Sequence, residues 1–470
     1  MTPRIIHEPR PEPHPSVTAN LHVAAGNWAA GRERVRASTD WEALRERGRE
    51  IRHDAIRNLP ELIDRLEERV TAAGGRVHRA GTAAEACAQV VAVCRERGAT
   101  RAVKAKSMLT EEIGLNDALA AAGIDAVETD LGEYVVQALG DRPSHLLAPA
   151  VHLNARQIAE LFERESGRAF DPDDTAALVA YARGVLRERF LAAEVGITGV
   201  NLAVAETGTL ILVESEGNIR LSTSLPRVHV AVMGIEKVVR DWAGGAHLMQ
   251  LLPLAAHGVP APASLSLITG PARDGDDGPE ELHLVLVDDG RSALRGTAYE
   301  SALHCIRCGA CLYACPVYRQ IGGHAYGSTY SGPIGAVLTP ALEQGAQSSD
   351  ELPWLSSLCG ACAEACPVKI PLDDQLVALR ADGARRHPRR AEAALFSAWA
   401  RLWSRPGGYR ATAATAGKAL GPLWARLTRS AGGDGWDARA PFPFSRWTDG
   451  RDIRAPDPEP FHARWRRLRG

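Results

Sequence analysis

Apolar and polar residues follow two different periods between residues 75 and 130. Short apolar runs that read as strands occur at Arg76–Arg79, Ala102–Lys106 and Ala126–Asp130. Stretches with the three-to-four-residue period of a helix, Ala83–Arg97 and Glu111–Ala122, separate them. Strands that alternate with helices of this length indicate a parallel sheet. This part of the chain therefore predicts an α/β domain.

The following 160 residues extend the same domain. A helical block covers Asn154–Val195, with a break near Gly167–Asp174. Gly199–Val213 reads as two strands that meet at the turn Glu206-Thr207-Gly208, and Glu216-Gly217-Asn218 predicts a further turn that connects a hairpin. Additional apolar runs predict strands at Val228–Met233, Ser264–Thr269 and Leu284–Val287.

The pattern divides the chain into four regions. Residues 1–25 are rich in proline and predict an extended leader, and one charged helix is expected over Asp40–Ala73. In the third region, helices are expected at Tyr299–Cys305 and Leu372–Arg380; in the fourth, at Ala391–Trp403. The regions are 1–64 (leader and helix), 65–290 (α/β domain), 296–380 (cysteine-rich domain) and 381–470 (basic tail with several tryptophans).

Seven of the nine cysteines lie in two groups within the third region. The first group has the spacing C-x2-C-x2-C-x3-C-P, by which bacterial-type ferredoxins hold [4Fe-4S] clusters, and the second repeats most of it. A zinc ribbon or disulfides are the alternatives, but neither needs four cysteines in this spacing before a proline. The cysteines are Cys305, Cys308, Cys311 and Cys315 in the first group, and Cys359, Cys362 and Cys366 in the second.

Two clusters of this type need eight ligands, whereas the motifs supply seven cysteines. In two-cluster ferredoxins the fourth cysteine of a group binds the other cluster. Cluster 1 would thus take Cys305, Cys308, Cys311 and Cys366, and cluster 2 would take Cys315, Cys359 and Cys362. Ser356 stands where the second group's first cysteine would be. Four possibilities remain open for the fourth iron of cluster 2: it binds the Ser356 oxygen, water or a partner's side chain, or it is lost.

Composition restricts the compartment and the partners. The start of the chain has no apolar signal-peptide core, and no run of about 18 apolar residues occurs, so we expect a cytoplasmic protein without a membrane span. Cys87 and Cys94 share one face of a helix and are expected to be buried thiols rather than ligands. From Arg380 onward, 19 Lys and Arg stand against 8 Asp and Glu, about +11, and the remainder carries about −13. No nucleic-acid-binding fold accompanies this basic tail.

The α/β domain has polar residues where its predicted strands end, which is where open α/β sheets bind ligands. A small-molecule site and ordinary helix caps are both consistent with them. The chain contains neither G-x-G-x-x-G nor G-x4-G-K-[ST], so nothing indicates NAD, FAD or ATP, and we expect a redox partner to supply the electrons. The residues are Lys104, Lys106, Ser107, Thr110–Glu112, Asp130, Glu133 and Glu206-Thr207-Gly208.

The chain resembles the bacterial lactate utilization protein B family over nearly its whole length. The resemblance rests on Val103–Glu112, Glu128–Glu133, Ala205–Thr209 with Glu216–Asn218, Leu225–His229, Gly234–Lys237 and the cysteine groups from Ser356 to Lys369. It implies an α/β domain similar to ribose-phosphate isomerases and CoA-transferases, followed by an α-helical ferredoxin-type module with two [4Fe-4S] clusters. The family has serine at the position of Ser356.

The resemblance also implies a function. The family is the iron–sulfur electron-transfer subunit of a system that oxidises L-lactate to pyruvate with two other subunits, one of which carries paired-cysteine motifs. This chain has no such Cys-Cys pair, which is consistent with a non-catalytic relay. Three other functions stay open: a relay for another hydroxy-acid or glycerol-phosphate dehydrogenase, an iron–sulfur sensor that binds nucleic acid, and a lyase acting at the incomplete cluster.

Overall fold

The computed structural model describes residues 15–273, 275–343, 349–388, 390–415, 418, 459 and 461–469. The chain divides into two compact units, residues 1–383 and residues 384–470. All nine cysteines belong to the first unit.

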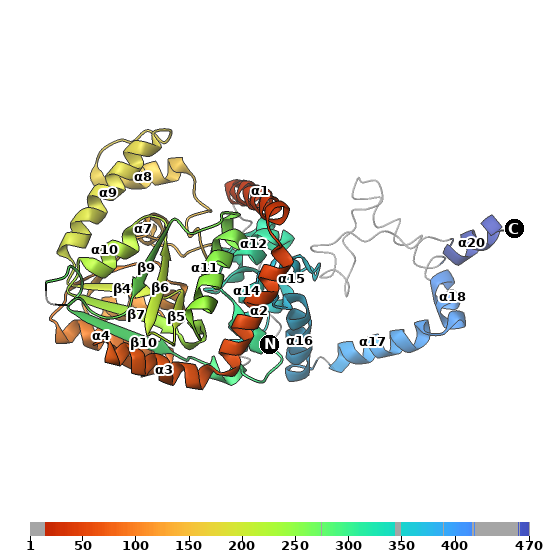
Figure 1. Ribbon diagram of the computed structural model, residues 1–470. Helices are drawn as coiled ribbons and strands as arrows, with labels where there is room; N and C mark the ends of the chain where they lie inside the picture. The colour runs from red at the N-terminus through yellow and green to blue at the C-terminus, as the bar shows by residue number, and fades with distance from the viewer. Residues whose placement is uncertain are drawn as a thin grey trace. The chain divides into compact units, whose positions relative to one another are not determined.

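A six-stranded, fully parallel sheet forms the centre of the first unit, with strand order β1-β10-β7-β4-β2-β3 (Figure 1). The parallel α/β core predicted from the sequence is therefore confirmed. Its strands are β1 (Arg76–Ala80), β2 (Arg101–Lys104), β3 (Asp125–Glu128), β4 (Val195–Gly199), β7 (Val228–Gly234) and β10 (Glu281–Val287).

Successive residues of the central strands face two different cores, because side chains alternate across a strand. In β7, Val230 and Val232 pack with α4 (Ala83–Glu96) and α6 (Leu115–Ala121). Ala231 and Met233 face the opposite side, where α3 (Leu59–Ala72) and the second sheet cover them. Burial on both faces explains why these strands read as nearly continuous apolar runs.

The β2–β3 end of the sheet has a third core. Val103 and Val127 pack against Phe162, Phe190 and the other apolar residues of three helices. These helices are α7 (Leu131–Leu139), α8 (Ala155–Ser166) and α9 (Thr175–Ala192).

A smaller sheet with strand order β8-β5-β6-β9 lies beside the first. The predicted pair of strands around Glu206-Thr207-Gly208 is present as the antiparallel pair β5–β6. The predicted hairpin turn at Glu216-Gly217-Asn218 is wrong, because Gly217 (φ 77°) instead starts α10 (Asn218–Ser224) and β6 pairs with β9. The strands are β5 (Leu202–Val204), β6 (Thr209–Glu214), β8 (Val238–Val239) and β9 (Ser264–Ile268).

Several helix predictions need correction. The single helix expected over Asp40–Ala73 is two, α2 (Trp41–Arg57) and α3, because Pro60 has no N–H to continue the first. The helix expected at Glu111–Ala122 is likewise split at Gly114 (φ 67°) into α5 (Met108–Glu112) and α6. The prediction of an extended leader over residues 1–25 is wrong from Pro15 onward, because α1 (Pro15–Ser38) begins there. Residues 1–14 lie outside the described residues.

The cysteine-rich region is built from short helices and packs against α1, α2 and α11 (Trp242–His257) (Figure 1). The helix expected at Tyr299–Cys305 is a 3-10 helix, η4 (Glu300–His304), and the one expected at Leu372–Arg380 is α16 (Leu372–Arg386). The others are α12 (Ala310–Ala314), α13 (Pro316–Ile321), η5 (His324–Tyr326), α14 (Gly332–Leu342), η6 (Leu352–Trp354) and α15 (Ala361–Ala365). Two further 3-10 helices, η2 (Ile235–Lys237) and η3 (Ser292–Leu294), come before this region in the chain.

The described part of the second unit consists mainly of α17 (Arg390–Trp403), α18 (Pro406–Thr415) and α20 (Phe461–Arg469). The expected helix over Ala391–Trp403 corresponds to α17. Its exposed apolar residues include Leu395, Phe396 and Trp399, at helical spacing on one side.

Candidate iron–sulfur site

The first cysteine group wraps around one short helix. Arg307 (φ 62°) and Gly309 (φ 72°) adopt left-handed conformations that turn the chain sharply between the first cysteines. The backbone N–H of Arg307 donates to Cys305 Sγ at 3.4 Å. Cys315 ends α12 and accepts from the N–H of Tyr318 at 3.5 Å at the start of α13. These hydrogen bonds stabilise negative charge on sulfur.

The second group repeats this geometry 51 residues later. Leu358 (φ 56°) and Gly360 (φ 78°) take the left-handed conformations of Arg307 and Gly309, and α15 takes the place of α12. Ser356 occupies the position equivalent to Cys305. The N–H of Leu358 donates to Ser356 Oγ at 3.1 Å, which is the same hydrogen bond that Arg307 makes to Cys305. The serine therefore replaces the first cysteine in three dimensions as well as in the sequence.

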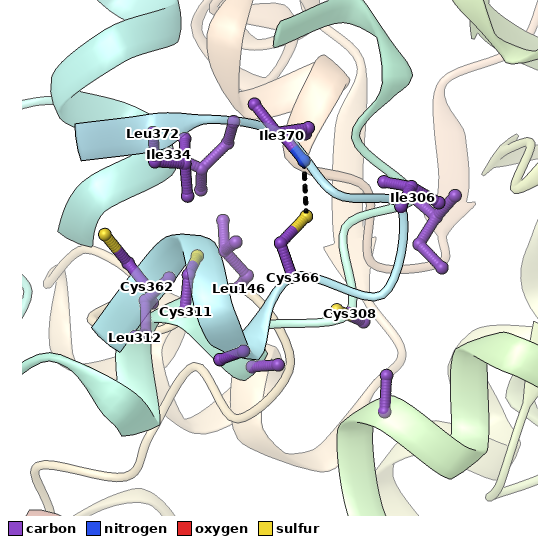
Figure 2. Packing of buried hydrophobic residues seen from close by; sticks show 14 of the residues in the cluster. Leu146, Ile306, Cys308, Cys311, Leu312, Ile334, Cys362, Cys366, Ile370 and Leu372 are labelled. Carbon is purple, nitrogen blue, oxygen red and sulfur yellow. Dashed lines mark hydrogen bonds between the residues drawn. The ribbon is translucent and has the colours of Figure 1, made fainter. Parts of the chain in front are cut away.

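The fold interleaves the two groups, since α12 and α15 lie side by side. One apolar cavity is lined by all four cysteines expected for cluster 1. Figure 2 shows Cys308, Cys311 and Cys366 gathered within this region, with the N–H of Ile370 donating to Cys366 at 3.3 Å. The lining residues are Cys305, Cys308, Cys311, Cys366, Leu146, Ile306, Gly309, Ile334, Pro367, Val368, Ile370 and Leu372.

Cys315 is brought to the other group, where it interacts electrostatically with Cys359 and Cys362. Cys359 is exposed, whereas Cys315 and Cys362 are buried. Burial raises the pKa of Cys366 to about 11 and that of Cys362 to about 12. Since metals bind the thiolate, bound iron would have to supply the charge that deprotonates these thiols. The seven sulfurs, the backbone donors and the apolar lining fit iron–sulfur clusters.

A group of buried cations surrounds the backbone of the first cysteine. Lys237 Nζ donates to the Cys305 carbonyl at 3.0 Å, and the Arg307 guanidinium lies 4.4 Å from the ring centre of Tyr330. Glu236 pairs with Arg291 at 2.7 Å and lies 3.6 Å from Arg307. Positive charge next to a cluster would favour its reduced state, so Arg307 is positioned to influence the reduction potential, whereas burial lowers the pKa of Lys237 to about 7.

The sequence did not single out this charge network, because its members are distant in the chain and each reads as an ordinary surface residue. The available signal was the charged pair Glu236-Lys237 between two apolar strands. The structure places this pair in η2, directly after the carboxyl end of β7. The cysteine-rich region thus lies against the edge of the sheet at which a small-molecule site was considered.

Several of the polar residues considered for that site form ion pairs and hydrogen bonds with neighbouring protein side chains. Lys104, 1% exposed, contacts Glu128 at 2.5 Å and Glu111 at 3.1 Å. Glu112 binds Arg291 at 2.8 Å and accepts from Tyr330 at 2.5 Å. Such contacts are those of a structural ion-pair network.

The remaining considered residues cap helices or shape turns. Ser107 caps α5, Asp130 caps α7, and Glu133 lies 3.1 Å from Lys106. Gly208 (φ 75°) packs so closely on Arg69 that a Cβ would come within 2.9 Å of the Arg69 carbonyl carbon. Glu206-Thr207-Gly208 therefore acts as a tight turn in the second sheet.

Comparisons with known proteins agree with this arrangement. The LUD domain family matches residues 63–287, and the 4Fe-4S dicluster domain family matches residues 301–370. A protein of Oceanobacillus iheyensis described as "Lactate utilization protein B" is 44% identical over 448 residues, covering 94% of this chain and 91% of its own. This chain belongs to the lactate utilization protein B family. The resemblance noted from its motifs is confirmed, as is its iron–sulfur character.

Other relatives carry the same description. The lactate utilization protein B of Shouchella clausii is 44% identical over 425 residues, covering 90% of this chain and 87% of its own. The lactate utilization protein B of Bacillus licheniformis is 42% identical over 448 residues, covering 93% of this chain and 92% of its own. Among solved structures, a DUF162 family protein from Deinococcus radiodurans is 17% identical and covers 49% of this chain and 98% of its own, with a TM-score of 0.28. That similarity is too low to carry an argument.

Within the described residues, no helix is both long and apolar enough to cross a membrane.

Proposed function

We propose that the chain is the electron-transfer subunit of a multi-component system that oxidises L-lactate to pyruvate. The observation that carries the proposal is the 51-residue repeat of the cysteine geometry, which brings seven cysteines together as two interleaved sets. A [4Fe-4S] cluster accepts and donates one electron at a time. Two clusters in one fold would suit a relay that receives electrons from one subunit and passes them to another.

The proposed ligands follow the interleaving. Cys305, Cys308, Cys311 and Cys366 would hold cluster 1 inside the apolar cavity, which excludes water and so lowers the local dielectric. Cys315, Cys359 and Cys362 would hold cluster 2, which lies nearer to solvent because Cys359 is exposed. We propose Ser356 Oγ as the fourth ligand of cluster 2, since it accepts the hydrogen bond that Cys305 Sγ accepts in the first repeat.

We propose that a redox partner supplies the electrons, since the sequence contains neither G-x-G-x-x-G nor G-x4-G-K-[ST]. The proposed partners are two other lactate-utilisation subunits, one of them with paired-cysteine motifs. An exposed cluster 2 is the better candidate for exchange with a partner, since transfer slows steeply as the protein layer between centres thickens. The α/β domain, which we propose to be related to ribose-phosphate isomerases and CoA-transferases, would provide the rigid support.

Growth tests the function. A Cys311→Ser strain should fail to grow on L-lactate and grow normally on glucose, because cluster 1 loses a buried ligand. Cys94→Ser is the matched control: Cys94 is also buried, but it packs in the α4 core and should leave growth on lactate unchanged. Normal growth of the Cys311→Ser strain on L-lactate would refute the proposal. Loss of growth on another hydroxy acid or glycerol phosphate instead would reassign the substrate.

Ser356 has its own test by electron paramagnetic resonance. Ser356→Cys should keep cluster 2 and alter its signal, since sulfur replaces oxygen on one iron. Ser356→Ala should yield the signal of a three-iron cluster on oxidation. Ser292→Ala, at an exposed position in η3, is the control. Identical spectra for Ser356→Ala and the wild type would exclude Ser356 as the ligand.

A further inference from the structure

A second group of metal-type side chains lies away from the cysteines. Asp141 follows α7, His152 belongs to the loop before α8, and His324 starts η5 in the cysteine-rich region. One ligand atom of each lies within 4.8 Å of the others. Three side chains from separate segments thus converge at one place, where the α/β domain meets the cysteine-rich region.

Both ring nitrogens of His152 have a polar partner, and one of its two neutral forms leaves Nε2 free to bind a metal ion. Ser144 Oγ donates its only hydrogen to the Pro149 carbonyl at 3.1 Å. The same oxygen lies 2.8 Å from His152 Nδ1, and with the hydroxyl hydrogen directed at Pro149 it accepts there from Nδ1–H. In the neutral ring, Nε2 then presents a lone pair.

That lone pair points at another acceptor. His152 Nε2 lies 3.0 Å from Asp141 Oδ2, and a carboxylate oxygen also has only lone pairs to offer. In this form a second ring proton or a metal ion must lie between the two acceptors, whereas a neutral ring protonated at Nε2 would donate an ordinary hydrogen bond to Asp141. His152 is only 7% exposed, and its Nδ1 contact is the kind of outer bond that orients metal-binding histidines.

His324 distinguishes a metal site from a simple ion pair, because a proton bridges only two groups, whereas a metal ion can bind three or more ligands. His324 Nε2 lies 3.8 Å from Asp141 Oδ1 and 2.7 Å from the carbonyl oxygen of Arg142. The two imidazole rings meet nearly edge to face, 4.6 Å between centres. Ligands bound to one ion at about 2.0–2.2 Å lie roughly 3 Å apart, so these separations suit a common ion.

The site is held in place by close packing. Tyr318, fully buried, donates to the Ser144 carbonyl at 2.8 Å. Gly323 lies so close to Ser144 that a Cβ there would come within 1.8 Å of its carbonyl oxygen. Tyr318 also donates its N–H to Cys315. The site is therefore joined through one residue to a cysteine proposed for cluster 2.

We infer that Asp141, His152 and His324 bind a divalent first-row transition ion, for which Zn²⁺ fits the ligands, with the Arg142 carbonyl as a further donor. Two imidazoles with a carboxylate suit Zn²⁺ or Fe²⁺ rather than Mg²⁺ or Ca²⁺. Asp141 and His324, 39% and 42% exposed, leave the ion accessible from solvent. On binding, the ring hydrogen of His324 would move from Nε2 to Nδ1, which leaves the Nε2 lone pair for the ion. It would clamp the loop before α8 to the cysteine-rich region.

The test is zinc binding to the full-length protein, purified without oxygen with its clusters in place. Zinc titration and zinc K-edge absorption should find about one zinc per chain, with nitrogen and oxygen ligands at about 2.0–2.2 Å. Asp141→Asn and His324→Ala, both at half-exposed positions, should each weaken zinc binding by about 100-fold or more, as expected for a lost ligand. Their iron content should stay that of the wild type.

Asp117→Asn and His22→Ala are the matched controls, because both replace exposed side chains of the same types elsewhere in the first unit. They should bind zinc like the wild type. The inference is overturned if the wild type binds no zinc, if Asp141→Asn and His324→Ala bind it equally well, or if the spectrum shows sulfur ligands at about 2.3 Å, which would place the zinc on cysteines.

Discussion

Replacing Arg52 by methionine should destabilise the first unit more than the loss of a surface charge would. Arg52 lies in α2 with no exposed surface. Its guanidinium donates to the carbonyls of Leu303 at 2.9 Å, Val238 at 3.1 Å and His304 at 3.2 Å, and to that of Glu236. Burial lowers its pKa to about 10, so it remains charged at pH 7.

The expected loss of stability follows from the four carbonyl acceptors that Arg52→Met leaves without a donor. A buried acceptor without a partner costs about 1–3 kcal/mol, so even the lower value gives about 4 kcal/mol for Arg52→Met. Arg52→Lys keeps a charge and three donors but lacks the planar fork, and should lose about half as much. Because Leu303 and His304 directly precede Cys305, the methionine variant should also hold less iron in cluster 1.

Denaturant unfolding without oxygen, followed together with iron release, measures both effects. Arg240→Met is the control: Arg240 is 37% exposed and pairs with Asp54 at 2.9 Å, so its loss should cost at most about 1 kcal/mol. If Arg52→Met unfolded within about 1 kcal/mol of the wild type and kept its full iron content, the four Arg52 hydrogen bonds would not be needed for the stability of the first unit.

Three further predictions concern buried groups of the α/β domain. Burial raises the pKa of Glu133 to about 7, above its unfolded value of about 4.3, so its stabilisation is complete below about pH 4 and is lost as pH rises through 7. The thermal midpoint of the wild type should fall between pH 6 and 8 more than that of Glu133→Gln; equal slopes would contradict this. Lys104→Met should cost about 3–5 kcal/mol in urea unfolding by leaving Glu128 buried without its cation, and Lys104→Met with Glu128→Leu should recover part of it. If the double variant recovered no stability, the unpaired Glu128 charge would not be the cause of the loss. Cys94→Ala should leave iron and sulfide per chain unchanged, and a loss of iron would contradict its assignment to the α4 core.

Much of the α/β fold could be predicted because its strands are buried on both faces. Such strands appear as short apolar runs between helices, as at β2, β3, β7 and β10, and the parallel sheet follows from their alternation. Several of the errors occurred where one residue changes the backbone. Pro60 divides a charged helical stretch, and Gly217 starts a helix where a hairpin turn was expected.

The cysteine groups could be located from spacing alone, since the spacing reflects how short loops wrap a cluster. The surroundings of Cys305 could not be predicted in the same way. Arg52 reaches carbonyls more than 180 residues away in the sequence, and Lys237 reaches Cys305 across 68 residues. No local pattern records such contacts. For the same reason, Asp141 and His152 gave no recognisable motif until the fold brought His324 to them.

The most direct test of the proposed relay is lactate-dependent reduction of the clusters. A tagged chain would be purified from its host without oxygen, together with whatever subunits accompany it, and mixed with L-lactate. We expect about eight irons per chain, and paramagnetic resonance signals from two reduced [4Fe-4S] clusters after L-lactate is added. Clusters that dithionite reduces but L-lactate leaves oxidised, in a complex that still contains its partner subunits, would contradict the proposed relay.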